Sequence, residues 1–146
     1  VRRDLGVDVA DVPGAGAAGG LGAGLIAFCR AEVRPGFDVV AEAVGLHERV
    51  RRSDVVVTGE GRLDRQSAFG KTTVRVAQMA RGAGKPVVAV AGSVDGGEAR
   101  RPFDAVFALT PDLAPLDEAM SRAGELLARA GEDVGGWIEG RTPGGA

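Results

Sequence analysis

The chain has 146 residues and a formal net charge of −2, and 45% of its residues are hydrophobic while 26% are charged. This balance excludes an intrinsically disordered protein, because enough apolar surface is present to offset the entropy of ordering the chain. The small negative net charge does not indicate nucleic-acid binding. No apolar run approaches the roughly 18 residues that a membrane-spanning helix needs.

Two helices are predicted in the first third of the chain, around a tract of glycine and alanine at residues 14–20. The first is expected over about residues 19–31. The single cysteine, Cys29, lies among apolar neighbours on this helix and is expected to belong to the hydrophobic core. Arg34-Pro35-Gly36 interrupts the pattern. The second helix is expected over Phe37–Val44, with Gly45 after its last turn. The sole histidine, His47, stands in a charged run and is expected at the surface.

From residue 54 onward, predicted strands and helices alternate. Apolar runs predict buried strands over residues 54–58, 87–91 and 104–109, and apolar spacing predicts helices over 71–83 and 115–130. The last helix carries an apolar stripe that includes Met120 and Leu127, and Gly131 is expected to end it. We therefore expect one three-layer α/β domain over residues 1–133, with a short, mostly parallel sheet, and a frayed glycine-rich tail over 134–146.

The segment Gly59–Gly70, which follows the first predicted strand, is expected to be a loop that carries the chemistry. Ligands of open parallel sheets bind beyond the carboxyl ends of the strands. Glu60 and Asp64 offer carboxylates, which suit Mg²⁺ or a general base, and Arg62 and Arg65 offer guanidinium groups, which suit phosphate or a small carboxylate. The competing interpretation is a solvated loop whose charges neutralise one another.

Gly70-Lys71-Thr72 is similar to the end of a phosphate-binding loop. The full pattern needs a glycine where Arg65 stands, so a standard P-loop NTPase is excluded. What remains is Lys71 in the first turn of a helix, where unpaired N–H groups favour anions. The alternative is an exposed helix start.

Gly14, Gly16 and Gly19 match the dinucleotide fingerprint G-x-G-x-x-G. Pro13 stands where the preceding strand should end, and no second strand with a terminal acid follows, so a nicotinamide enzyme is not expected. The tract has two open interpretations. It could present backbone N–H groups to an anion, or it could let helices pack closely.

Four ordered blocks resemble the bacterial class I glycerate kinase family over about residues 4–93. They are Pro13–Gly24, Arg34-Pro35-Gly36, Thr58–Asp64 with Gln66 and Gly70-Lys71, and Lys85–Gly92. The resemblance implies cytoplasmic phosphoryl transfer from ATP, with Mg²⁺, to D-glycerate, giving phosphoglycerate and most readily the 2-phosphate. Members are two-lobed α/β kinases more than twice as long, so this chain, which begins with Val1, is expected to be a C-terminal portion whose partner is the rest of the kinase.

The resemblance also implies roles for individual residues. Asp64 accepts the proton of the attacking hydroxyl or holds Mg²⁺, Glu60 takes the other role, and both are candidate metal ligands. Arg62 clamps a phosphate or the glycerate carboxylate, and Lys71 lies against phosphate charge. The expected substrate and phosphate contacts are Gly14, Gly16, Gly19, Gly20, Thr58, Gly59, Gly61, Gln66 and Ser67.

Two functions from other classes stay open at this point. One is a nucleotide- or sugar-phosphate-binding α/β module without catalysis, which would bind ligand and give no turnover. The other is an inactive kinase fragment, which would do neither.

Overall fold

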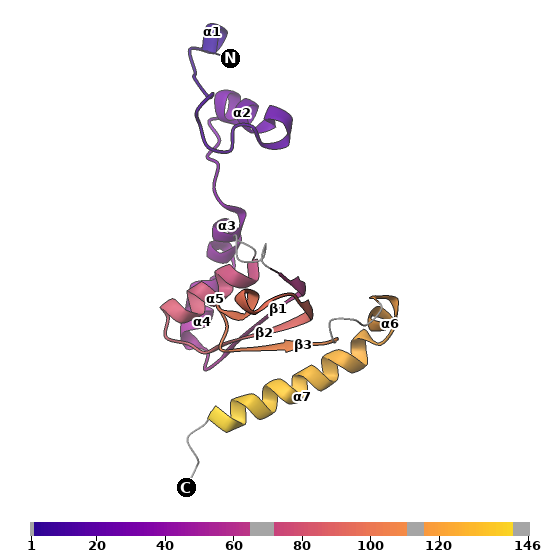
Figure 1. Ribbon diagram of the computed structural model, residues 1–146. Coiled ribbons are helices and arrows are strands. Elements are labelled where there is room, and N and C mark those ends of the chain that lie inside the picture. The colour runs from indigo at the N-terminus through magenta and orange to yellow at the C-terminus, as the bar shows by residue number, and fades with distance from the viewer. Residues whose placement is uncertain (1, 65–71, 111–115, 142–146) are drawn as a thin grey trace. The chain divides into compact units, whose positions relative to one another are not determined.

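The structure, a computed structural model, describes residues 2–64, 72–110 and 116–141 (Figure 1). The chain divides into two compact units, Val1–Ala43 and Val44–Ala146. No helix in these described ranges is both long and apolar enough to cross a membrane.

The first unit is helical and has little core. Its helices are α1 (Arg2–Leu5), α2 (Ala17–Cys29) and α3 (Gly36–Ala43). Among its described side chains, those of Ala15 and Ala41 are buried, whereas Phe28 of α2 is 71% exposed. Cys29 is exposed as well, so the expectation that it lies in a core is wrong. It is the last residue of a helix whose apolar side chains are not covered within this unit.

The second unit is built on a parallel sheet with strand order β1-β2-β3. The strands are β1 (Val56–Leu63), β2 (Val87–Val94) and β3 (Ala105–Ala108). Helix α5 (Thr72–Gly82) lies between β1 and β2 in the sequence, and the short 3₁₀ helix η2 (Gly97–Arg100) lies between β2 and β3. The predicted α/β class with a parallel sheet is confirmed.

Helices lie on both sides of this sheet. Helix α5 packs on β1 and β2, and the long helix α7 (Ala123–Arg141) packs on β3, so that α5 and α7 flank the sheet (Figure 1). Val87, Val88 and Ala89 are consecutive and fully buried. Because successive strand residues point to opposite faces, both faces of β2 are covered. Two shorter helices, α4 (Leu46–Arg52) and α6 (Leu116–Ser121), complete the unit.

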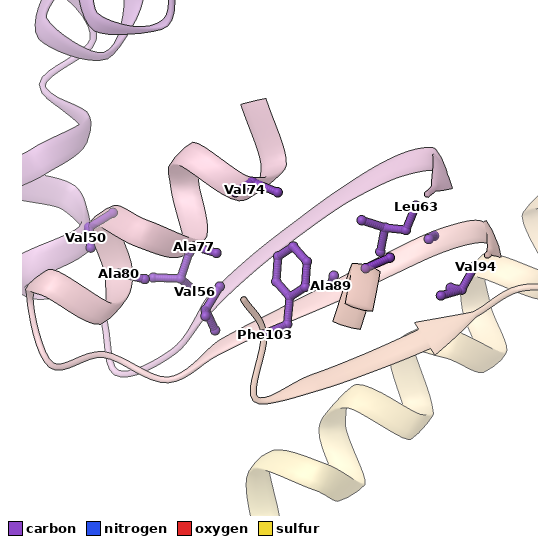
Figure 2. Close-up of a cluster of buried hydrophobic side chains, with 12 residues drawn as sticks. Val50, Val56, Leu63, Val74, Ala77, Ala80, Ala89, Val94 and Phe103 are labelled. Carbon is purple, nitrogen blue, oxygen red and sulfur yellow. The ribbon is translucent and has the colours of Figure 1, made fainter. Parts of the chain in front are cut away.

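The core lies between α5 and the sheet. Its members indicate a turn in the pleat, by which we mean a point where the side chains of a strand change the face to which they point. Val56 and Leu63 of β1 belong to one buried cluster, as do Ala91 and Val94 of β2 (Figure 2). Within each pair the residues are an odd number of positions apart, so a regular strand would point them to opposite faces. Gly61 and Gly92 lie between the residues of each pair, at the point where the ladder passes from Glu60↔Ala91 to Arg62↔Ser93.

Three sequence predictions about where strands and helices end or divide are wrong. Strand β1 continues through Leu63, so residues 59–63 are strand and not loop, because β2 extends to Val94 and pairs with them. Helix α7 continues through Gly131 to Arg141, so residues 134–141 are helical and not frayed. Burial of Ala130 and Val134 stabilises it against its glycines. The single helix expected over 115–130 is two helices, α6 and α7.

An exposed ion-pair network joins α6 to α7. Arg122 donates to Glu125 at 2.9 Å and lies 3.6 Å from Glu118, and the hydrogen bond from Arg122 lowers the pKa of Glu125. A carboxylate with a lowered pKa stabilises the fold above its unfolded pKa, and this contribution disappears as the pH falls through the folded pKa.

We expect Arg122→Ala to raise the pKa of Glu125 toward its ordinary value, because the hydrogen bond and the nearest positive charge are both removed. Carboxyl NMR titration measures this. Arg129→Ala is the control and should shift the pKa less, since Arg129 lies 4.0 Å from the Glu125 carboxylate. Equal shifts in the two variants would contradict the assignment.

Candidate functional site

A cleft of about 950 Å³ opens at the carboxyl ends of the three strands. The ends of β1 and β2 contribute Gly61, Arg62 and Gly92–Gly96, and the segment after β3 contributes Leu109 and Thr110. Helices α6 and α7 contribute Ala119, Met120, Ala123 and Leu126. This is the edge at which open parallel sheets bind their ligands, so the cleft is the candidate site in the described part of the chain.

Arg62 is the predicted site residue whose charged side chain lines the cleft. One of its guanidinium nitrogens donates to Asp95 at 3.1 Å, and both side chains are about two-thirds exposed, at 64% and 66%. An ion pair this exposed contributes little stability. The ion pair instead positions the Arg62 side chain. The Asp95 amide donates to the Leu63 carbonyl at 2.7 Å, which fixes Asp95 beside the end of β1.

Sequence reasoning missed Asp95, which directly follows β2, and its neighbours. A signal was present, because Ser93, Asp95 and Gly96 directly follow a run predicted as a buried strand. Parallel strands end at one edge of a sheet, so the residues after the second strand must lie beside those after the first. Arg62 and Asp95 meet there although they are 33 positions apart.

Glu60 lies on β1, and its side chain contacts the first turn of α5. It is not among the residues that line the cleft. The Thr73 hydroxyl donates to Glu60 Oε1 at 2.6 Å, and Thr73 is 4% exposed in the first turn of the helix. Asp64 directly follows β1, is half-buried and is also outside the lining. Within residues 2–64, 72–110 and 116–141, no three histidine, cysteine or carboxylate side chains gather as a metal cluster. The magnesium roles of Glu60 and Asp64 therefore stay predictions.

The Gly14–Gly20 tract belongs to the first unit, and Gly14 and the nearby Gly22 are closely packed there. A Cβ on Gly14 would lie 2.5 Å from Val33 Cγ1, and one on Gly22 would lie 2.5 Å from the Gly14 carbonyl oxygen. Gly14, Gly19 and Gly20 all have positive φ, which places them in the region that favours glycine. Backbone amides at Ala15, Ala17 and Gly20 donate to carbonyls of the same unit. Close packing is thus observed at Gly14, whereas a Cβ on Gly16, Gly19 or Gly20 would meet no atom within 4 Å. Anion binding by these four glycines stays a prediction.

The remaining predicted site residues divide into three groups. Thr58 and Gly59 lie inside β1, away from the cleft lining, and a Cβ on Gly59 would lie 2.7 Å from the Val90 carbonyl oxygen. Gly61 lines the cleft. Gln66, Ser67 and Lys71 lie outside the described residues.

Thr73→Val is expected to lower the free energy of unfolding by about 2 kcal/mol, the usual size for a hydrogen bond to a charged group. Valine keeps the shape of threonine but cannot donate to Glu60. Urea denaturation followed by circular dichroism measures the change. Thr73→Ser restores the hydroxyl and should recover most of the loss, and equal losses in both variants would show that the hydrogen bond is not the cause.

Comparisons with known proteins all point to one family. The family model described as the glycerate kinase family matches residues 1–139. The chain is 48% identical over 137 residues to a glycerate kinase of Halalkalibacterium halodurans and 42% identical over 137 residues to glycerate 2-kinase of Escherichia coli, covering 92% of this chain in both cases. A crystal structure of a candidate glycerate kinase 2 from Salmonella typhimurium LT2 superposes on 95% of this chain with a TM-score of 0.76 and 39% identity.

These relatives are much longer than this chain. The matched segment covers 36% of the length of the two kinases and 36% of the crystallised chain. The chain therefore spans about a third of the relatives it matches.

Proposed function

The chain belongs to the glycerate kinase family, and from this premise we propose that it forms part of an enzyme that phosphorylates D-glycerate with ATP and Mg²⁺. The observation that carries the proposal is the cleft at the carboxyl ends of the strands, with Arg62 at its edge and Asp64 directly after β1. We propose the 2-phosphate as product, since the E. coli relative is named glycerate 2-kinase.

In the proposed reaction, the glycerate hydroxyl oxygen attacks the γ-phosphorus of ATP. A bond forms between them, the bond to the bridging oxygen breaks, and ADP leaves with that electron pair. The Asp64 carboxylate accepts the hydroxyl proton, and Arg62 neutralises charge on the phosphates. Bound Mg²⁺ would neutralise further phosphate charge, and the carboxylate oxygens of Glu60 and Asp64 are donors of the kind it prefers.

The Arg62–Asp95 pair supports this assignment of Arg62. A guanidinium group on a flexible stem loses several rotamers when it binds a phosphate, and an existing contact to Asp95 at 3.1 Å reduces that loss. We place the enzyme in the cytoplasm, where ATP is supplied and where a single unpaired thiol, Cys29, stays reduced. The rest of the longer kinase is the proposed partner of this chain.

A chimera tests the proposal. The matching segment of E. coli glycerate 2-kinase is replaced by this chain, and turnover is measured with a coupled assay for phosphoglycerate. Turnover that depends on ATP, Mg²⁺ and D-glycerate is expected, and NMR of the product identifies the phosphorylated carbon. Nucleotide binding by a folded chimera without turnover would instead support a binding module and overturn the kinase proposal.

A further inference from the structure

The cleft is far larger than a three-carbon acid requires. Its volume is about 950 Å³, near the upper end of the roughly 300–1,000 Å³ found for pockets that enclose drug-sized ligands. D-glycerate alone would leave most of this space to water. A second, larger ligand therefore fits the cleft better than the acceptor does.

One wall of the cleft is apolar and suits a flat ring. It is formed by Met120 of α6 and Leu126 of α7, with the small side chains of Ala119 and Ala123 beside them. Met120 is 68% exposed, so its thioether is available to a ligand. Methionine sulfur makes favourable contacts with aromatic rings, and alanines leave the space that such a ring occupies. A hydroxy acid gains nothing from this wall.

Another part of the cleft lining is polar and has an uncovered backbone. Gly61, Gly92 and Gly96 leave the main chain without side-chain cover, so a ligand can approach it closely. The Gly92 carbonyl accepts both the backbone N–H of Thr110, at 3.1 Å, and its hydroxyl, at 2.7 Å. These two bonds tie the segment after β3 to β2, which makes this side a fixed surface. Arg62 supplies positive charge there.

We propose that this cleft is the nucleotide subsite of the kinase. The adenine ring lies against Met120 and Leu126, and the phosphates extend toward Arg62, which Asp95 positions. The proposal rests on the proposed function and adds which ligand of that reaction occupies the described cleft. It also implies that glycerate binds outside the apolar wall.

The test compares two adjacent leucines of α7. Leu126 lines the cleft, whereas Leu127 is 52% exposed and outside the lining, so Leu126→Asp and Leu127→Asp add the same charge to the same helix. Binding of a fluorescent N-methylanthraniloyl-ADP to the 146-residue chain is measured, with ATP as competitor. We expect Leu126→Asp to weaken binding by about tenfold or more and Leu127→Asp to change it by less than about twofold.

Circular dichroism establishes that each protein is folded, and Ala123→Phe, which fills the cleft without adding charge, decides the question if Leu126→Asp does not fold. Equal binding by Leu126→Asp and Leu127→Asp, or a folded wild-type chain that does not bind the nucleotide, overturns the subsite. In the chimera, Leu126→Asp should raise KM for ATP and leave KM for glycerate unchanged. Turnover with an unchanged KM for ATP overturns the subsite alone, whereas nucleotide binding without any turnover overturns the kinase function alone.

Discussion

Asp64→Asn is expected to lower kcat of the chimeric kinase by about 10²-fold or more, the range found for loss of a general base. Asp64 directly follows β1, at the edge of the sheet where the cleft opens. Asparagine keeps the size of the side chain, but it cannot take the proton of the attacking hydroxyl or offer an anionic oxygen to Mg²⁺. The coupled assay at saturating ATP and glycerate measures this.

The matched control is Asp54→Asn. Asp54 is exposed just before the opposite end of the same strand, so the same chemical change there should leave kcat within about twofold. The two roles of Asp64 give different results. A base produces an acidic limb in the pH profile that disappears in the variant, whereas a magnesium ligand raises the Mg²⁺ concentration needed for half-maximal rate. Near-normal turnover of Asp64→Asn would remove both roles.

The sequence alone predicted the fold where hydrophobic burial decides local structure. The run at Val87–Ala91 is a strand because both faces of β2 are covered and require apolar residues. Val56 and Val57 are also strand, but Val57 is 53% exposed, so the expectation that this first strand is buried on both faces is wrong. Residues 59–63 are polar and rich in glycine, and on their own they favour a loop. They are strand because β2 offers a partner through Val94, and such pairing is a tertiary effect that local propensity does not contain.

Helix α7 is a second case in which tertiary packing overrides local propensity. Gly131 and the glycines after it indicate a helix end, and each costs up to about 1 kcal/mol relative to alanine. The helix continues to Arg141 because Ala130 and Val134 are buried. The apolar stripe was also misleading, since Met120 and Leu127 are exposed rather than core.

The candidate site could be predicted only in part. The carboxyl-end rule identified the correct edge of the sheet, and Arg62 lines the cleft as expected. Asp95 directly follows the neighbouring strand, β2, and the same rule indicates this residue when it is applied to that strand. Glu60 is close to Arg62 in the sequence, yet it is not among the residues that line the cleft, and its carboxylate accepts a hydrogen bond from Thr73 in the first turn of α5. The packing of α5 on β1, which brings Thr73 to Glu60, is a tertiary contact that the sequence alone does not reveal.

Gly92→Ala is expected to lower the free energy of unfolding by about 3 kcal/mol, the upper part of the range for an overpacked interior. A Cβ at this position would approach the Gly61 carbonyl oxygen more closely than real Cβ atoms do. The obstacle is the backbone of the paired strand, which cannot rotate away as a side chain would. Urea denaturation followed by the fluorescence of the single tryptophan, Trp137, measures the loss.

Gly61→Ala is the matched control, because a Cβ on Gly61 has no atom within 4 Å. It should change the unfolding free energy by less than about 1 kcal/mol, since alanine is at least as compatible as glycine with an extended strand. The asymmetry between two facing glycines follows from the turn in the pleat, which directs one Cβ position into the partner backbone and the other into open space. Equal losses from the two substitutions would show that the strands do not approach in this way. The shared cluster of Leu63, Val94 and Val56 would then need another cause.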